Sequence, residues 1–443
     1  MSATSSSRAS VRALDREIFL LAVPTFATLV SEPALLLADS AIIGHLGTTE
    51  LAGLGIAGNL LGILTGLSIF LAYGTTGTVA RRLGAGDLRF ALAGGLDGMV
   101  LAVLLGAVLC GLLQLLMPTV IGWYGVGPEV ASAARSYLRI AACGLPSLLL
   151  ILASTGVLRG LQDTRTPLFV AISCNVINIG LNFLFVYGFG LGIAGSATGS
   201  LIAQTGSAVL LATVVLRGAR RNHTKISFHP RGVLAAARSG FWLVIRTATL
   251  QLSITVTTAV AAGMGAIALA THQVANSLWT FLAFALDALA IAAQAVIGRY
   301  LGAGDVDLVR RLTRRMIGWG VLAGVIFGLV VTLARPWVDQ LFSPDPAVQE
   351  LLRQVLLVIA CITPLAGVVF VLDGVLIGAG DGRYLALAGL IAMASYVPLA
   401  LLVHGFGAGL VWLWIAYGVF ILARMITLVL RARTDRWMRT GLA

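Results

Sequence analysis

Hydrophobic residues occur along this chain in long runs that are separated by short polar segments. A run of about 20 apolar residues is long enough to cross the roughly 30 Å hydrocarbon core of a bilayer as an α-helix. Runs of this kind lie approximately at 17–43, 51–79, 91–117, 132–157, 167–187, 192–216, 237–263, 268–297, 313–334, 351–376, 384–402 and 408–430. The pattern predicts an all-α polytopic membrane protein with twelve transmembrane helices and both termini on one side.

An internal repeat divides these twelve helices into two sets of six. An offset of 218 residues aligns RRLGAGD at 81–87 with RYLGAGD at 299–305, VLRGLQD at 157–163 with VLIGAGD at 375–381, and Pro146 with Pro364. A repeat with an even number of spans returns to its starting orientation, so its axis runs along the membrane normal. We expect two pseudo-symmetric six-helix lobes at 1–217 and 236–443, joined by a cytoplasmic linker at 218–235.

The charge of the chain is explained by membrane topology. The chain is 58% hydrophobic and 11% charged, with a formal net charge of +12. One set of alternating loops, together with the termini, carries 24 of the 30 Lys and Arg residues, and the other set carries four. The positive-inside rule therefore predicts cytoplasmic termini, and nucleic acid is not an expected partner.

Three further features of composition narrow the setting. All basic residues except Lys225 are arginine, a bias typical of a GC-rich bacterial genome, so we expect the bacterial inner membrane. The four cysteines lie in apolar segments without metal-ligand spacing, which indicates neither disulfides nor zinc. The N-terminal segment leads into a span without a small-residue cleavage site, so no removable signal peptide is expected.

The sequence contains short motifs that resemble cofactor-binding sites of enzymes, but their context argues against that function. GLGIAG at 190–195 satisfies the dinucleotide pattern, but it lies between two spans without a preceding strand. The two LGAGD loops lack the Lys-Ser/Thr of a phosphate-binding loop, and we interpret them as tight turns. No Ser, His and acid or Cys and His arrangement appears at suitable spacing, so neither catalysis nor a cofactor is expected.

The first span carries carboxylates in an apolar setting. Glu32 and Asp39 are two helical turns apart and share one face, and Pro33 between them removes a backbone hydrogen bond and favours a hinge. A charged residue at the centre of a span costs about 2.5 to 3.5 kcal/mol on insertion scales. Asp39 has no nearby cation in the sequence, and desolvation favours its neutral form, so we interpret it as a proton or cation site. For Glu32 a structural role is an equal alternative.

The fifth span adds amide side chains on a single helix face. Asn175, Asn178 and Asn182 fall at i, i+3 and i+7. Their amide oxygens can accept a hydrogen bond or coordinate a small cation. Intramembrane amides also hold neighbouring helices together, and for Asn175 this is an equal alternative.

The second lobe contains a more scattered set of polar residues within its spans. They are Arg246, Gln251, His272, Gln273, Asn276, Asp287, Gln294 and Asp373. We regard Gln251, Asp287 and Asp373 as candidate substrate contacts. A buried, structural ion pair between Arg246 and Asp287 is an alternative for those two residues.

The order of these motifs resembles the multidrug and toxic compound extrusion (MATE) transporters, specifically their DinF-like branch. The resemblance rests on ADSAIIGHLG, RRLGAGD, LRGLQDTRTPL, ALDALAIAAQAVIGRYLGAGD and LDGVLIGAGD, and it covers nearly the whole chain. It implies two six-helix lobes around a cleft and export of organic cations against inward protons or sodium. By position, Asp39 matches the family's first-span acid that binds the coupling cation, and Asn178 and Asn182 match polar fifth-span positions. Several relatives have an aspartate where this chain has Asn182.

These observations together predict an efflux antiporter. Ionised Asp39 would attract a lipophilic cation, and protonation would remove that attraction and release the cargo. Asn175 and Tyr187 are candidate substrate contacts in the same lobe, and we expect a monomer among membrane lipids. The coupling ion is expected to be the proton, with sodium at Asp39 as the alternative. A lipid-linked precursor flippase and an uncoupled channel or receptor remain the alternative functions.

Overall fold

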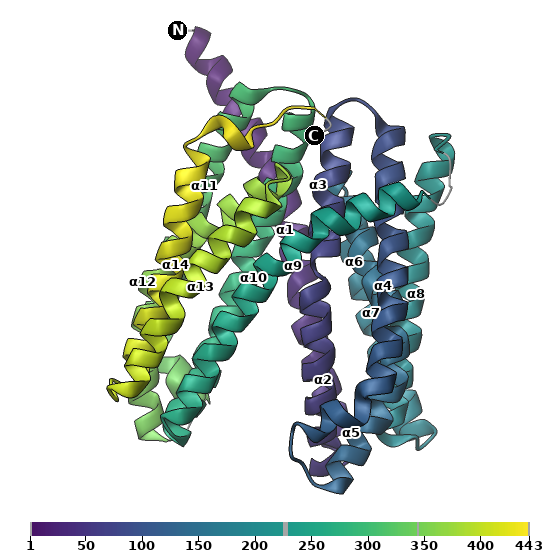
Figure 1. The fold of residues 1–443 in the computed structure, drawn as a ribbon, viewed down its shortest axis with the longest axis vertical. Helices are drawn as coiled ribbons and strands as arrows, with labels where there is room; N and C mark the ends of the chain where they lie inside the picture. The colour runs from purple at the N-terminus through teal and green to yellow at the C-terminus, as the bar shows by residue number, and fades with distance from the viewer. Residues whose placement is uncertain (1, 225–228, 343–344, 442–443) are drawn as a thin grey trace. The chain divides into compact units, whose positions relative to one another are not determined.

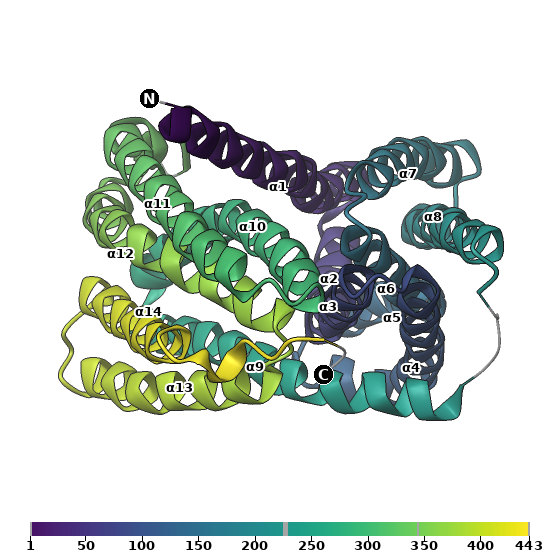
Figure 2. The same cartoon turned by 90° about the horizontal axis from the view of Figure 1, so that it is seen from above.

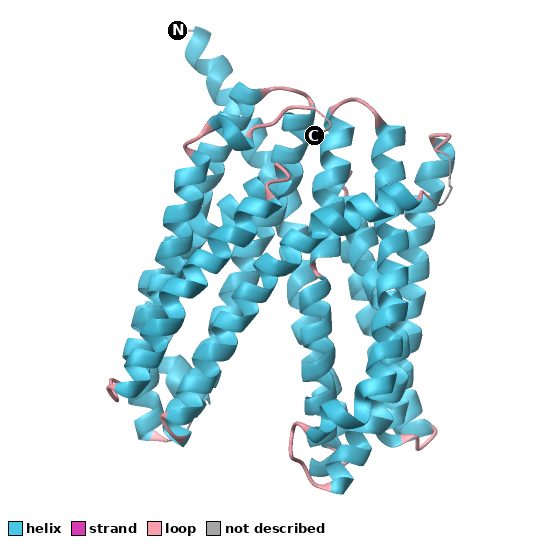
Figure 3. Ribbon diagram, viewed as in Figure 1, coloured by secondary structure: helices cyan, strands magenta, loops and turns pink. Residues whose placement is uncertain are grey.

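The computed structural model describes residues 2–224, 229–342 and 345–441, with side chains described except at residues 2–13, 32 and 339. Within these ranges the chain is helical and has no strand (Figure 3). In this described part of the chain, twelve helical spans are long and apolar enough to cross a membrane. The predicted fold class and the twelve predicted spans are therefore confirmed.

The helices fall into two compact units, residues 27–240 and residues 1–26 with 241–443, here called the N-terminal and C-terminal units. The N-terminal unit contains the end of α1 (Ser2–Gly44), α2 (Thr48–Ser68), α3 (Phe70–Gly84), α4 (Leu88–Gly122), α5 (Pro128–Ala141), η1 (Ala142–Gly144), α6 (Leu145–Gly160), α7 (Arg165–Phe183), η2 (Leu184–Gly188), α8 (Gly192–Arg221) and the start of α9 (Pro230–Gly263) (Figure 1). Three of its spans combine shorter helices: α2 with α3, α5 with α6, and α7 with η2.

The C-terminal unit contains the start of α1 and the remainder of the chain. Its helices are the rest of α9, α10 (Ala266–Gly302), α11 (Val306–Phe342), α12 (Pro346–Gly378), α13 (Gly382–Gly405), α14 (Leu410–Ala432) and η3 (Asp435–Trp437). Within this unit α12 packs against α10, α11 and α14, and α13 packs against α14 (Figure 2).

These units differ from the predicted lobes at their edges, because α1 and α9 are each shared between the two. In the C-terminal unit, the Asp15 carboxylate accepts hydrogen bonds from Arg315 and Trp319 and so ties the first part of α1 to α11. In the N-terminal unit, Gly240 of α9 lies against the ring of Phe70. The segment predicted as a linker thus includes the end of α8 and the start of α9.

The internal repeat is visible in the packing as well as in the sequence. A Cβ atom on Gly156 of α6 would collide with the carbonyl oxygen of Ala72, and one on Gly374 of α12 would collide with that of Ala290. Both glycines and both alanines are 218 residues apart. Helix backbones that approach this closely require small residues at the interface, so the same packing device occurs in both units.

The LGAGD segments form tight turns, as interpreted from the sequence. Gly86 and Gly304 have φ values of 83° and 82°, in the left-handed region that favours glycine. The following aspartates cap the next helices, since Asp87 accepts a hydrogen bond from Phe90 N at 2.8 Å and Asp305 accepts one from Leu308 N at 3.0 Å.

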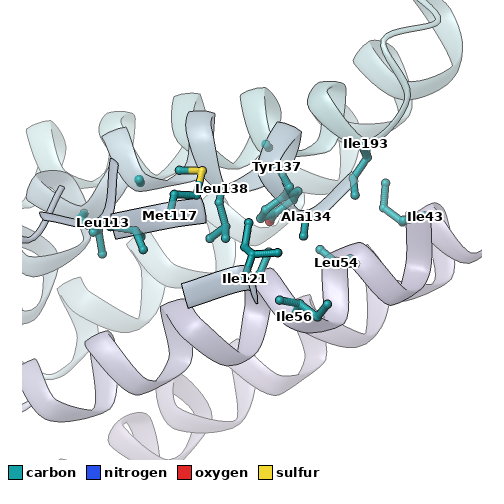
Figure 4. Close-up of a cluster of buried hydrophobic side chains, with 14 of the residues drawn as sticks. Ile43, Leu54, Ile56, Leu113, Met117, Ile121, Ala134, Tyr137, Leu138 and Ile193 are labelled. Atoms are coloured by element: carbon teal, nitrogen blue, oxygen red, sulfur yellow. The ribbon is translucent and has the colours of Figure 1, made fainter. Parts of the chain in front are cut away.

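Buried hydrophobic side chains fill the interior of the N-terminal unit beside the first span (Figure 4). The cluster brings together residues of α1, α2, α4, α5 and α8, among them Ile43, Leu54, Ile121, Leu138 and Ile193. These contacts bury one face of α1 near its C-terminal end, and that face also carries the candidate carboxylate.

Candidate functional site

Asp39 is buried inside the N-terminal unit, with an exposed fraction of 5%. Leu36 and Leu37, on other faces of α1, are 56% and 72% exposed, so the acid lies on the side of the helix that packs inward. Asp39 Oδ1 accepts a hydrogen bond of 2.6 Å from the Asn182 side-chain amide of α7. Among the residues that the structure describes, Asp39 has no ion-pair partner.

The Asp39–Asn182 contact begins a chain of hydrogen bonds between three helices. Asn182 Nδ2 also donates to Asn178 Oδ1 at 2.9 Å, and Asn178 Nδ2 donates to Ser200 Oγ of α8 at 3.0 Å. Tyr137 of α5, which packs against α8, lies beside Ser200 and near Asp39. Asn178 and Asn182 are 1% and 0% exposed, so this network is enclosed by protein.

One atom of the network lacks a hydrogen-bond donor. Asn182 Oδ1 is buried and has no partner among the described residues. It lies so close to Gly199 of α8 that a Cβ atom there would collide with it. A buried polar atom without a partner costs about 1–3 kcal/mol. The amide that donates to Asp39 therefore also carries an oxygen atom, Asn182 Oδ1, that is free to accept a hydrogen bond.

The chemistry available at this site is that of oxygen atoms. A carboxylate, two amide oxygens and the hydroxyls of Ser200 and Tyr137 can take up a proton or surround a small hard cation, which prefers oxygen ligands. Where the chain is described, no group of three or more His, Cys, Asp or Glu could hold a metal ion. This donor set suits a monovalent ion better than a multiply charged one, since it has a single carboxylate.

Two other predicted residues attach α1 to the fifth span on either side of Asp39. Asn175 Nδ2 donates to the carbonyl oxygen of Ser31 at 2.8 Å, and Tyr187 Oη donates to that of Ile42 at 2.7 Å. The last carbonyls of a helix have no partner within the helix, and Ile42 belongs to the final turn of α1. The structure favours a helix-fastening role for Asn175 in this conformation.

Tyr187 also lies in an unusual backbone segment. Residues Leu184–Gly188 form a π-helix, in which the amide of Phe189 donates to the carbonyl of Leu184. Such turns are rare and are frequently found at functional sites. The Tyr187 side chain is 46% exposed, so it is accessible as well as hydrogen-bonded, and its predicted contact with substrate stays a prediction.

The remaining predictions for the first span concern Glu32 and Pro33. The side chain of Glu32 lies outside the described residues, so its predicted role stays a prediction. α1 passes through Pro33 as one continuous helix from Ser2 to Gly44. The predicted hinge therefore lies six residues before the Asp39 contact, within a helix that is unbroken in this conformation.

In the C-terminal unit the most deeply buried charges form a cluster of three. Asp373 of α12 is 2% exposed, and its Oδ2 accepts from Arg246 Nη2 of α9 at 2.7 Å and from Arg424 Nη2 of α14. Arg246 thus forms its ion pair with Asp373, which lies 127 residues away in sequence. This arrangement favours a structural role for Asp373 in the described conformation, although the sequence indicated it as a substrate contact.

The other polar residues predicted in this unit differ in their exposure. Gln251 is exposed on α9 and Asp287 is partly buried on α10. His272 is buried, with its Nε2 at 2.9 Å from Thr258 Oγ1 and its ring 5.7 Å from that of Trp414. Among the residues singled out from the sequence, the structure brings together Asp39, Asn178 and Asn182 in one network and Arg246 with Asp373 in another.

Ser200 and Tyr137 were not predicted from the sequence. A signal for Ser200 was present, because Ser196, Ser200 and Ser207 fall at i, i+4 and i+11 and form a hydroxyl-bearing face on α8. No pattern in the sequence singled out Tyr137, since a buried tyrosine on an amphipathic helix is ordinary. Its place beside Ser200 results from the packing of α5 against α8.

Several known proteins are similar to this chain in sequence and in fold. Residues 24–184 and 243–402 match the MatE family model. Protein DETOXIFICATION 45, chloroplastic, of Arabidopsis thaliana is 28% identical over 93% of this chain and 77% of its own length. DNA damage-inducible protein F of Escherichia coli is 28% identical over 94% of this chain and 91% of its own length.

A crystal structure of the Vibrio cholerae MATE transporter VcmN in the bent form has the same fold. It superposes with a TM-score of 0.87, at 22% identity, and covers 97% of this chain and 99% of that one.

Proposed function

This chain belongs to the MatE family, and we propose that it exports small organic cations in exchange for protons that enter through Asp39. The family assignment makes it a multidrug and toxic compound transporter in a membrane, and not an enzyme. The identity of the coupling ion, the charge of the substrate and the role of Asp39 are the proposed steps.

The observation that carries this proposal is the isolation of Asp39 from counter-charges. Its hydrogen-bond partner is the neutral amide of Asn182, and no described Lys or Arg forms an ion pair with it. An unpaired charge in a low-dielectric interior is costly, so the carboxylate gains from taking up either a proton or a cation. The two ligands then compete for one group.

Competition of this kind couples the binding of the two ligands, as exchange requires. If proton binding lowers the affinity for the cation, cation binding must lower the affinity for the proton by the same factor. The unpartnered Oδ1 of Asn182 and the hydroxyl of Ser200 extend the site and can orient either ligand. Apolar surroundings supply undirected contact for substrates of varied shape.

The hydrogen bonds between α1 and the fifth span suggest how protonation could move a helix. α1 is held at Ser31, Asp39 and Ile42. The outer two contacts use backbone carbonyls, and their strength does not depend on the charge of Asp39. Protonation weakens the middle contact because hydrogen bonds to an ionised acceptor are the stronger ones. The segment between Pro33 and Ile42 would then be free to rearrange.

Sodium is the alternative coupling ion, since the same oxygens suit a hard monovalent cation. The proton is preferred because the network is enclosed by protein, with Asn178 and Asn182 1% and 0% exposed, and is closed on one side by the Gly199 backbone, so that a proton fits it more readily than a coordinated cation. We also propose that both termini are cytoplasmic, in a bacterial inner membrane, and that the chain acts as a monomer.

The test uses purified full-length protein in liposomes with a fluorescent lipophilic cation. Transport is measured under a proton gradient alone and under a sodium gradient alone, for the wild type, Asp39→Asn and Asp307→Asn. The last variant is the control, because it neutralises a carboxylate with an 86% exposed side chain. We expect proton-driven transport in the wild type and the control and its loss in Asp39→Asn. Full transport by folded Asp39→Asn would refute the proposal.

A further inference from the structure

The first three turns of α11 carry four arginines that have no counterpart in the equivalent helix of the N-terminal unit. Their equivalents 218 residues earlier, at the start of α4, are Leu92, Ala93, Leu96 and Asp97. Further along these two helices the packing contacts are nevertheless the same: Gly106 of α4 approaches the backbone of Pro146, and Gly324 of α11 approaches that of Pro364. The two helices are thus packed alike, but only α11 has arginines at these four positions, which are 310, 311, 314 and 315.

Two of the four arginines are neutralised by acids of the C-terminal unit. Arg310 contacts Asp307 at 3.3 Å and Asp435 at 2.9 Å, and Arg315 contacts Asp15 at 2.7 Å. The other two, Arg311 and Arg314, are exposed and have no ion-pair partner among the described residues. Arg311 and Arg314 lie beyond the first turn of α11, so the helix dipole gives no reason for their presence.

An apolar stripe continues directly from these two arginines along the same face of α11. Spacings of three and four residues align one face of a helix. The face consists of Arg311, Arg314, Gly318, Leu322, Val325 and Leu329. The three aliphatic residues are 46%, 40% and 57% exposed. A Cβ atom on Gly318 would meet nothing within 4 Å, so the surface is open between the arginines and the stripe.

The dimensions of this face match one lipid molecule in one leaflet. From Gly318 to Leu329 the helix rises by about 16 Å, at 1.5 Å per residue, which is close to half of a roughly 30 Å hydrocarbon core. We infer that this face of α11 binds an anionic phospholipid, with its phosphate on Arg311 and Arg314 and an acyl chain along Leu322, Val325 and Leu329. The open surface at Gly318 would accommodate the glycerol region.

Both the negative charge and the acyl chains of the lipid contribute to this binding. Arginine recognises phosphate through paired, charge-assisted hydrogen bonds, and cytoplasmic basic clusters attract anionic lipids. A soluble phosphate would use the arginines without the stripe, and a neutral lipid would use the stripe without the arginines. An anionic phospholipid satisfies both, and its binding is independent of what the protein transports.

The experiment counts lipids bound to the purified full-length chain by native mass spectrometry in a neutral detergent. Phosphatidylglycerol, phosphatidylcholine with the same chains, and chain-free glycerophosphoglycerol are titrated separately. We expect phosphatidylglycerol to bind most tightly. The double variant Arg311→Gln with Arg314→Gln should bind it roughly thirtyfold more weakly, at roughly a factor of five for each arginine.

The matched control removes Arg217 and Arg220 of α8, which have the same i, i+3 spacing and are exposed. It should retain most of the affinity. Gly318→Leu keeps all arginines and fills the open surface without a packing collision, so it tests the site in a variant expected to fold. It should also weaken binding.

Equal losses in the α11 and α8 variants would overturn the inference, because they would show attraction to net charge alone. Equal affinity for phosphatidylcholine, or glycerophosphoglycerol binding as tightly as the intact lipid, would also overturn it.

Discussion

Replacing Asp373 with Asn should destabilise the protein more than replacing Arg424, one of the two arginines that share its carboxylate. Asp373 is 2% exposed, and Arg246 and Arg424 are 5% and 4% exposed. Asp373→Asn leaves both guanidiniums without this carboxylate in the interior. Removing one partner of a buried ion pair costs about 3–5 kcal/mol, and we expect a loss of unfolding free energy in that range.

Arg424→Gln should cost less because it leaves the 2.7 Å contact between Arg246 and Asp373 in place. The loss is then mainly one hydrogen bond between charged groups, about 1.5–3 kcal/mol. In the double variant the buried Arg424 charge is absent together with the carboxylate. The combined loss should therefore be smaller than the sum of the single losses, as expected for residues in one network.

The assay is equilibrium unfolding of the full-length protein in a mild detergent, followed by tryptophan fluorescence and by far-ultraviolet circular dichroism. The two signals should give the same order of stability: wild type, Arg424→Gln, then Asp373→Asn. A loss for Asp373→Asn that equals or falls below that for Arg424→Gln would refute the reasoning. Strict additivity in the double variant would show that the groups are not coupled.

Three further variants test local contacts by the same unfolding measurement. Gly374→Ala forces a Cβ atom against a backbone carbonyl and should cost about 1–3 kcal/mol, whereas Gly318→Ala, in open space, should be neutral or stabilising. Tyr187→Phe removes the hydrogen bond to Ile42 and should cost about 0.5–1.5 kcal/mol; no change would show that the bond is replaced by water. Asp87→Ala removes the N-cap of α4 and should cost about 1 kcal/mol, and an unchanged midpoint would contradict this.

Much of the architecture could be derived from the sequence because the signals for it are local or periodic. Each span can be identified from its own apolar residues. A helix in hydrocarbon must form its backbone hydrogen bonds internally and present apolar side chains to lipid. The repeat, read from motifs such as the two LGAGD turns, reappears in the left-handed glycines Gly86 and Gly304. The units of the structure differ from the predicted lobes at α1 and α9, which the two units share. The sequence of a continuous helix does not show at which residue its contacts pass from one unit to the other.

The sequence predicted several residues of the candidate site but not the contacts between them. Helical periodicity placed Asn178 and Asn182 on one face and singled out Asp39 by its cost in an apolar span. It could not choose their partners, because a period specifies a face and not what packs against that face. The Asp39–Asn182 bond and the pairing of Arg246 with Asp373 join helices far apart in sequence, and the extension to Ser200 joins two consecutive helices. Those contacts were decided by the tertiary packing of helices, because polar side chains buried there must find partners among the residues that packing brings near.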